Sequence, residues 1–166
     1  KRTIASTPVG GRYRLIDFNL SNMVNSGIHD VGVVIKNNYQ SLIDHVGSGK
    51  EWDMARKNGG LTILPPYGGD STSIYSTRLQ AVKSILGFIE SSNSEYVVFS
   101  DCFNVCNIDY KEIIEQHIAK EADITCVYRE HNVTFDDYMP IVTFAVDKNQ
   151  RIRKFDIRRN FFGPAL

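Results

Sequence analysis

Strand-like and helix-like apolar patterns alternate along this chain, and the alternation restricts the fold more than any other feature. Continuous apolar runs predict strands, whereas apolar residues that recur every three or four positions predict helices. Strands are expected at 31–36, 61–64, 96–100, 123–128, 141–146 and 151–156, and helices at 14–26, 41–46, 74–89 and 110–122. Alternating strands and helices form a mostly parallel sheet with helices on both faces. The prediction is therefore an α/β fold of the doubly wound type.

The last two expected strands are separated by the short polar stretch Asp147–Gln150, so they are predicted to form an antiparallel hairpin. Two longer stretches, 47–60 and 65–73, have the glycine, proline, serine and threonine content of loops. In doubly wound sheets, ligands bind beyond the carboxyl ends of the strands. We therefore expect a ligand near the loops that follow Leu64 and Ser100.

Size and charge exclude several classes of function. The 166 residues, 42% of them hydrophobic, suffice for one globular domain. Because 19 basic side chains balance 19 acidic ones, the net charge gives no reason to expect a nucleic-acid or membrane partner. No apolar run approaches the roughly 18 residues of a membrane span, and no signal peptide is recognisable. A cytoplasmic protein is expected, and a small anionic ligand held by local charges stays open.

The three cysteines, Cys102, Cys106 and Cys126, are odd in number and have no Cys-x-x-Cys spacing. Reduced thiols are therefore expected instead of a disulfide framework. Because no histidine lies near Cys102 and Cys106 in the sequence, a tetrahedral metal site is not expected there. The four scattered histidines are interpreted as surface or capping residues.

The stretch Pro8–Phe18 reads Pro-Val-Gly-Gly-Arg-Tyr-Arg-Leu-Ile-Asp-Phe and continues as Asn-Leu-Ser-Asn. Gly10 and Gly11 permit a tight loop whose amides face a ligand or a neighbouring loop. The helix after this loop is expected to end at Gly27 in a left-handed C-cap. Taken alone, these residues are more typical of a structural loop before a core helix.

This motif, followed by Asn25-Ser26-Gly27-Ile28, resembles the signature of the glucose-1-phosphate adenylyltransferases, or ADP-glucose pyrophosphorylases. The similarity covers nearly the whole chain. It implies that residues 1–166 form part of a Rossmann-like nucleotidyltransferase domain, without the family's first strand and carboxyl-terminal left-handed β-helix domain. The family's first strand lies inside the sheet, so its absence is expected to expose apolar edges that a second chain or a rearranged segment covers.

Adenylyl transfer to a sugar phosphate needs backbone amides and basic side chains on the phosphates, and carboxylates for Mg²⁺. Several of the family's polar groups are replaced here. The family's Lys-Pro-Ala matches Ile4-Ala5-Ser6, its Gln-Gln matches Tyr67-Gly68, its Gly-Thr-Ala-Asp matches Thr77-Arg78-Leu79-Gln80, and its Glu-Lys-Pro matches Ile157-Arg158-Arg159. Its glycine-rich triphosphate loop does not precede Lys1 in this sequence. We therefore expect this chain alone to be inactive, with no catalytic residue assigned.

The resemblance nevertheless gives three sets of candidate site residues. Asp101, at the carboxyl end of the expected strand 96–100, matches a Mg²⁺-binding aspartate and is either a metal ligand or a relic that caps the loop. A nucleotide or sugar-phosphate pocket is expected from Gly10, Gly11, Tyr75 and Arg158. An effector site is expected from Lys1, Arg2 and Lys36, although the first two fit solvated terminal charges equally well. Mg²⁺ is implied for an intact family member, whereas no cofactor is expected in these residues themselves.

Loss of reactive groups from a retained scaffold leads to one functional hypothesis and two alternatives. The hypothesis is a regulatory subunit of glucose-1-phosphate adenylyltransferase in glycogen biosynthesis, which forms an oligomer with a catalytic subunit and binds a sugar phosphate or nucleotide. The first alternative is a catalytically competent adenylyltransferase of which these residues are only a part. The second is a sugar-phosphate-sensing domain without a catalytic partner.

Overall fold

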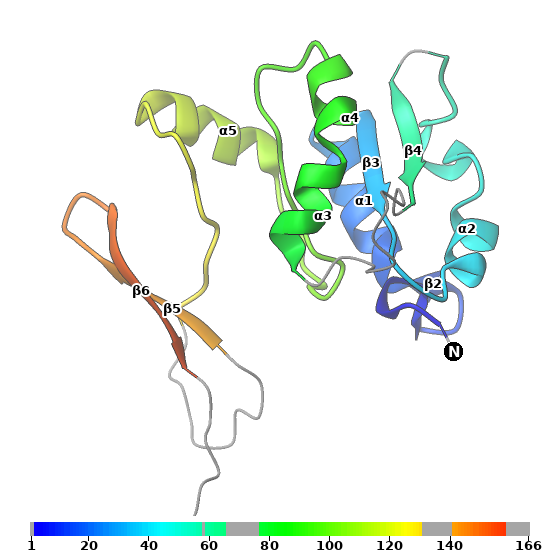
Figure 1. The fold of residues 1–166 in the computed structure, drawn as a ribbon, viewed down its shortest axis with the longest axis horizontal. Helices are drawn as coiled ribbons and strands as arrows, with labels where there is room; N and C mark the ends of the chain where they lie inside the picture. The colour runs from blue at the N-terminus through cyan, green and yellow to red at the C-terminus, as the bar shows by residue number, and fades with distance from the viewer. Residues whose placement is uncertain (1, 58, 66–76, 131–140, 159–166) are drawn as a thin grey trace, which may run out of the picture. The chain divides into compact units, whose positions relative to one another are not determined.

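The computed structural model describes residues 2–57, 59–65, 77–130 and 141–158 (Figure 1). The chain divides into two compact units, residues 1–125 and 126–166, which are described separately. Whether both belong to a single domain stays a prediction.

The first unit contains the alternating elements that the apolar patterns predict. Their order is η1 (Ile4–Ser6), β1 (Pro8–Val9), β2 (Tyr13–Arg14), α1 (Leu15–Asn25), β3 (Asp30–Val34), α2 (Gln40–Val46), η2 (Lys50–Trp52), β4 (Gly60–Leu64), α3 (Arg78–Ser84), α4 (Leu86–Ser91) and α5 (Tyr110–Ala119). Strands β3 and β4 pair in parallel, with Asp30 opposite Gly60 and Val34 opposite Leu64. A parallel pair joined through α2 is a β-α-β unit, which confirms the predicted α/β class.

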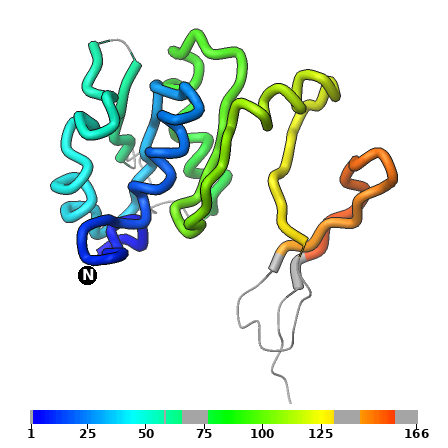
Figure 2. Tube along the Cα trace, turned by 180° about the vertical axis from the view of Figure 1, so that it is seen from behind, coloured from blue at the N-terminus to red at the C-terminus, as the bar shows by residue number. Residues whose placement is uncertain are grey.

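Helices cover both faces of β3. Helix α1 lies on one side, and α3 and α4 lie on the other, as the opposite views of Figures 1 and 2 show. A Cβ added at Gly32 in β3 would lie 2.8 Å from Phe88 Cε1, so α4 packs directly on the strand. On the α1 side the core contains Ile16, Leu20, Val31, Ile35, Leu42, Val46 and Met54. This core fixes the loops that leave the strands.

Helix α1 ends as its sequence predicts, and Asp17 in its first turn caps its start. At its start, the Arg14 amide donates to Asp17 Oδ2 at 2.9 Å. At its end, Gly27 has φ 79° and its amide donates to the Val24 carbonyl at 2.9 Å, while the Ile28 amide donates to Met23 O at 2.8 Å. The predicted left-handed C-cap at Gly27 is therefore confirmed.

Two predicted strands are wrong. Residues 96–100 and 123–128 have no strand assignment, although residues 96–100 run nearly straight beside the helices of their unit (Figure 2). A strand requires a hydrogen-bonded neighbour, and β3 and β4 pair only with each other among the described residues. An apolar composition thus indicates that a segment could form a strand, but it does not provide the neighbouring strand with which the segment would pair.

The predicted helix 74–89 is two helices, because the α-helical backbone is interrupted at Ile85, which ends α3 and begins α4. Residues 74–76 lie outside the described part of the chain. Thr77 caps α3, since its Oγ1 accepts the Gln80 amide at 3.2 Å. The helical prediction is therefore correct in type, with an additional break.

The second unit contains the predicted hairpin. Strands β5 (Ile141–Val146) and β6 (Ile152–Arg158) are antiparallel, with Phe144 opposite Phe155. The Arg151 amide donates to Asp147 Oδ1 at 3.0 Å. Arg153 Nε donates to Oδ2 of the same carboxylate at 2.8 Å. These donors, with the Arg151 amide the strongest, lower the pKa of Asp147 below its ordinary value.

Candidate functional site

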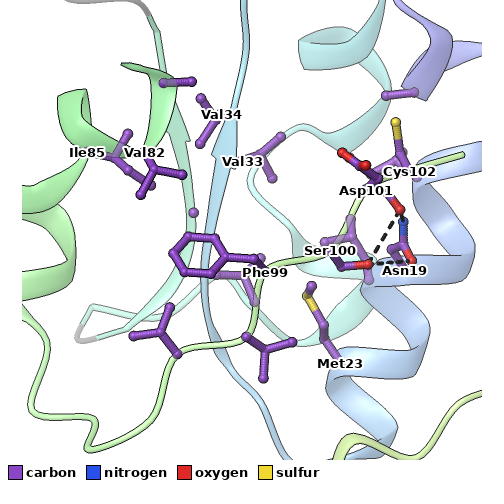
Figure 3. Close-up of a pocket in the computed structure, with 18 of the residues that line it drawn as sticks. Asn19, Met23, Val33, Val34, Val82, Ile85, Phe99, Ser100, Asp101 and Cys102 are labelled. Atoms are coloured by element: carbon purple, nitrogen blue, oxygen red, sulfur yellow. Dashed lines mark hydrogen bonds between the residues drawn. The ribbon is translucent and has the colours of Figure 1, made fainter. Parts of the chain in front are cut away.

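A cavity of about 1130 Å³ lies in the first unit between β3 and the segment Tyr96–Phe103, with α1 on one side and α3 and α4 on the other. Its wall is mainly apolar. Figure 3 shows Met23, Val33, Val82, Ile85 and Phe99 around it. A cavity of this size with a few polar groups at its edge has the character of a ligand or peptide site.

Polar side chains line this cavity beyond the carboxyl end of β3. Lys36 and Asn37 lie two and three residues after the end of β3, and Arg78 and Asp101 line the same cavity. This is the end of the sheet at which the sequence predicts a ligand. Lys36 was predicted for an effector site and Asp101 for a metal site, but both line this one cavity. Arg78 was not predicted as a site residue.

Asp101 is held by its backbone and by its side chain. Asn19 Nδ2 donates to the Asp101 carbonyl at 2.8 Å (Figure 3). The carboxylate Oδ2 lies 2.9 Å from Arg78 Nη1, and the two side chains are 43% and 81% exposed respectively. An ion pair this exposed contributes about 0.2–1 kcal/mol. Arg78 therefore neutralises Asp101 without contributing much to stability.

Polar residues of α1 and of its C-cap, Ser26, form hydrogen bonds with the loop after Asp101. Asn22 Nδ2 donates to the Cys106 carbonyl at 2.8 Å, and Ser26 Oγ accepts the Tyr110 amide at 2.9 Å. Asn19 and Asn22 are buried. We did not predict these contacts, although two asparagines three residues apart on a buried helix face are a recognisable signal, because buried amides need partners.

The described residues around Asp101 do not form a metal site made of protein ligands alone. Mg²⁺ prefers octahedral oxygen ligands and is bound by one or two carboxylates together with substrate phosphates and water. In the described part of the chain, no group of three His, Cys, Asp or Glu side chains is placed to hold a metal. Next to the Asp101 carboxylate the structure places a guanidinium instead of a second oxygen ligand. The Mg²⁺ role of Asp101 stays a prediction.

Cys102 lines the same cavity and is half-buried. Burial is the main cause that raises the pKa of its thiol above the ordinary value, and the neighbouring Asp101 carboxylate adds to it, whereas a backbone hydrogen bond acts in the opposite direction. The thiol is therefore protonated near neutral pH and is a weak nucleophile.

The glycines of the Pro8–Phe18 motif form the predicted tight loop. Gly10 and Gly11 connect β1 to β2 with φ 59° and 79°, in the left-handed region that favours glycine. Both are exposed, and neither lines the cavity described above. The structure therefore does not bring them together with Asp101.

The motif's acid and arginine instead join α1 to α2. Asp17 Oδ1 lies 2.6 Å from His45 Nε2, and Arg14 Nη1 donates to Ser41 Oγ at 3.0 Å. Asp17 is buried. These contacts give part of the motif a structural role.

The remaining candidates are only partly described. Arg2 is exposed and does not line the cavity, whereas Thr3 and Ile4 do. Lys1, Tyr75 and the side chain of Arg158 lie outside the described part of the structure. The predicted pocket of Gly10, Gly11, Tyr75 and Arg158, and the effector set of Lys1, Arg2 and Lys36, therefore stay predictions.

In the described part of the chain, none of the helices combines the length and the apolarity that a membrane span requires. This agrees with the absence of a long apolar run in the sequence.

Comparisons with known proteins agree with the fold. The chain is 43% identical over 153 residues to a glucose-1-phosphate adenylyltransferase of Thermosipho melanesiensis, which covers 92% of the chain and 37% of the relative. It is 43% identical over 152 residues to the enzyme of that name from Thermotoga maritima, 91% of the chain and 36% of the relative. It is 34% identical over 157 residues to the Bacillus cytotoxicus protein of the same name, a match that covers 94% of the chain and 41% of the relative.

The chain thus spans well under half the length of these relatives. The family model described as nucleotidyl transferase matches residues 5–156, which is most of the chain and includes both parallel strands and Asp101. By its fold and by this match, the chain belongs to the nucleotidyl transferase family.

Proposed function

We propose that this chain is part of a regulatory subunit of glucose-1-phosphate adenylyltransferase in glycogen biosynthesis, weakly active or inactive by itself. The observation that carries the proposal is the ion pair between Asp101 and Arg78. The carboxylate that matches the family's metal ligand lies beside the Arg78 guanidinium, and Arg78 stands where the family's Gly-Thr-Ala-Asp segment has threonine. A divalent cation would have to compete with that guanidinium.

Two other replaced positions, Gln80 and Ile4, also lack the family's reactive group. Gln80, which matches the family's aspartate, takes part in the cap of α3: the Thr77 amide donates to its Oε1 at 3.4 Å, and the Gln80 amide donates to Thr77 Oγ1. Ile4, which matches the phosphate-contacting lysine, is 52% exposed and lines the cavity. An aliphatic side chain cannot neutralise a phosphate. These positions favour retention of the scaffold over retention of the chemistry.

A subunit of this kind acts through its contacts. It would bind the active arrangement of a catalytic subunit more tightly than the inactive one, and so shift the equilibrium by that difference in binding free energy. The partner is then a catalytic glucose-1-phosphate adenylyltransferase subunit, and the assembly is an oligomer.

The test uses the whole natural protein, with and without a catalytic adenylyltransferase subunit from the same organism. Pyrophosphate release from ATP and glucose 1-phosphate is measured with Mg²⁺. We expect little release by the protein alone, and a changed rate or effector response of the catalytic subunit when both are present. No change in the partner would contradict the proposal. Release by the protein alone at an enzymatic rate would instead establish the competent enzyme.

Two variants sharpen this test. Asp101→Asn should leave the partner's rate unchanged, because the exposed Asp101 has a weak ion pair and no catalytic role under the proposal. Asp44→Asn, at another exposed acid, is the matched control. If the protein alone is active and Asp101→Asn lowers its kcat about 100-fold or more while Asp44→Asn does not, Asp101 is a metal ligand and the proposal is wrong.

A sugar-phosphate sensor without a catalytic partner is the second candidate, favoured by the two basic side chains, Lys36 and Arg78, that line the cavity. Isothermal titration of the whole protein with glucose 1-phosphate distinguishes it. Binding that is the same with and without the catalytic subunit favours the sensor, whereas binding that appears only in the complex favours the regulatory subunit.

A further inference from the structure

We propose that the Arg78 guanidinium takes the place of a divalent cation beside Asp101, so that the polar end of the cavity binds a phosphate group without needing Mg²⁺. The inference deepens the proposed function and rests on its premise that the chain binds a sugar phosphate or nucleotide without transferring it. It is carried by the ion pair between Arg78 and Asp101, by the donors that Arg78 has left for a ligand, and by the charge at this end of the cavity.

The Asp101 carboxylate is already paired with a positive charge. Its Oδ2 lies 2.9 Å from Arg78 Nη1. The backbone of the same residue is held by the buried Asn19, whose Nδ2 donates to the Asp101 carbonyl at 2.8 Å (Figure 3). A cation that used Oδ2 as a ligand would therefore have to displace the guanidinium.

Arg78 can contact a ligand and Asp101 at the same time. A guanidinium carries five N–H donors in a planar fork, and this geometry matches the oxygens of a phosphate. Nη1 contacts Asp101, but the side chain is 81% exposed, so its other nitrogens can be reached from solvent. The guanidinium can therefore link the carboxylate to a phosphate, as a bound Mg²⁺ links a carboxylate to a substrate phosphate.

The charge at this end of the cavity suits an anion. Lys36 and Arg78 are positive and Asp101 is negative, while Asn37 adds a neutral side-chain amide. Asp30 also lines the cavity, but it is the first residue of β3 and so lies at the opposite end of the strand. Positive charge is therefore in excess beyond the carboxyl end of β3. With threonine in place of Arg78, Asp101 and a phosphate would be two like charges beside a single lysine, and a cation would be needed between them.

A bound phosphate strengthens this arrangement. Without a ligand the exposed ion pair is weak, and Arg78 can leave Asp101. Hydrogen bonds between a guanidinium and a phosphate are charge-assisted and often bidentate, so the ligand holds Arg78 in place. A divalent cation at Asp101 would then lie next to a guanidinium, and the repulsion between them opposes metal binding. Mg²⁺ should therefore not improve the binding of the phosphate.

Isothermal titration tests the inference on the whole natural protein, alone and in complex with the catalytic subunit. Glucose 1-phosphate and ATP serve as separate probes, each with excess Mg²⁺ and with a chelator, and they distinguish a sugar phosphate from a nucleotide as the source of the phosphate. We expect one probe to bind with an affinity no higher in Mg²⁺ than in the chelator. Arg78→Thr should lower that affinity at least about 10-fold in the chelator, and Mg²⁺ should restore part of the loss through Asp101.

Three further variants make the test specific. Lys83→Thr is the matched control, because Lys83 is an exposed cation of the same helix and does not line the cavity. Arg78→Lys keeps the positive charge without the planar fork, so it should bind more weakly and still not require Mg²⁺. Arg78→Thr combined with Asp101→Asn should lose the restoration by Mg²⁺. Circular dichroism checks that each variant folds, as the exposure of Arg78 leads us to expect. The catalytic subunit is the same in every complex, so a difference between variants belongs to this chain.

Several results would overturn the inference: binding that requires Mg²⁺, binding of neither probe, or equal affinities for Arg78→Thr and Lys83→Thr. The proposed function keeps its own assay, because the rate of pyrophosphate release by the catalytic subunit is measured separately and with Mg²⁺ present. A changed partner rate together with binding that requires Mg²⁺ would support the regulatory subunit and discard Arg78 as the replacement for the metal.

Discussion

Replacing Asp17 should destabilise the first unit more than replacing any exposed acid. Its carboxylate is buried and accepts two hydrogen bonds from different elements. Oδ2 accepts the Arg14 amide at 2.9 Å where α1 begins, and Oδ1 lies 2.6 Å from His45 Nε2 in α2. The residue therefore stabilises the start of one helix and its packing against another.

The two contacts give the size of the effect. Loss of a helix-capping side chain costs about 1 kcal/mol, and loss of a hydrogen bond to a charged group costs about 1.5–3 kcal/mol. Asp17→Ala should therefore lower the free energy of unfolding by about 2.5–4 kcal/mol, a large part of the roughly 5–15 kcal/mol of a typical domain. Asp17→Asn keeps an acceptor for the Arg14 amide and should lose less.

Urea unfolding followed by circular dichroism measures these differences, with His45→Ala and the double variant completing a cycle. The coupling between the two sites should exceed about 1 kcal/mol, since each single change removes the same hydrogen bond. Asp44→Asn, at an exposed position of α2, should stay within about 0.5 kcal/mol of the natural chain. If Asp17→Ala costs less than about 1 kcal/mol, or if Asp17 and His45 behave additively, the structural role assigned to this pair is wrong.

Three further predictions concern other parts of the chain. Gly60→Ala should unfold the first unit, because φ at Gly60 is +101° and the added Cβ would lie 2.3 Å from a backbone oxygen. Gly87→Ala is the control: its Cβ would meet no atom within 4 Å, so the variant should be neutral or slightly stabilising. Thermal unfolding compares the melting temperatures of the two variants. The pKa of the Asp147 carboxyl is lowered, so its carboxylate stabilises the hairpin fully at pH values above the ordinary carboxyl pKa, and this stabilisation is lost as the pH falls through the lowered pKa. NMR spectra of the turn amides should therefore change below about pH 4 as the turn loosens. Asp147→Asn, whose turn does not titrate, should show no such change. Cys102 should react with iodoacetamide about 10-fold more slowly than the exposed Cys106 near neutral pH, as mass spectrometry of labelled peptides would show; equal rates would contradict its burial.

Elements whose partners are near in sequence were predictable. The apolar spacing and Gly27 indicate α1 and its end, and the β5–β6 hairpin follows from two apolar runs around a four-residue polar turn. The β3–β4 pair also follows from the alternation, because a short helix between two strands favours a parallel neighbour. In these cases the residues that stabilise an element lie within or next to it.

Features that depend on distant residues were not predictable. Residues 96–100 have the composition of a strand, but whether they pair depends on what lies beside β3, which local pattern does not encode. Asp101 was identified as a candidate by its place after an apolar run, whereas its partner Arg78 lies 23 residues earlier and only the fold brings the two together. The Asp17–His45 contact, 28 residues apart, was missed for the same reason.

The departure from the family's pattern at Arg78 leaves the core of the first unit undisturbed. Leu20 and Leu42 are buried in the core, and the Gly27 cap is intact. Because the free energy of unfolding of a domain is small, such packing has to be kept for the chain to fold. Random substitution would damage packing as readily as chemistry, because most changes in a core destabilise it. At Arg78, by contrast, an exposed guanidinium faces Asp101, and this substitution costs the fold little. Such a pattern favours selection on stability and surface contacts over selection on phosphate chemistry, and this is the physical ground for proposing a subunit that acts through a partner.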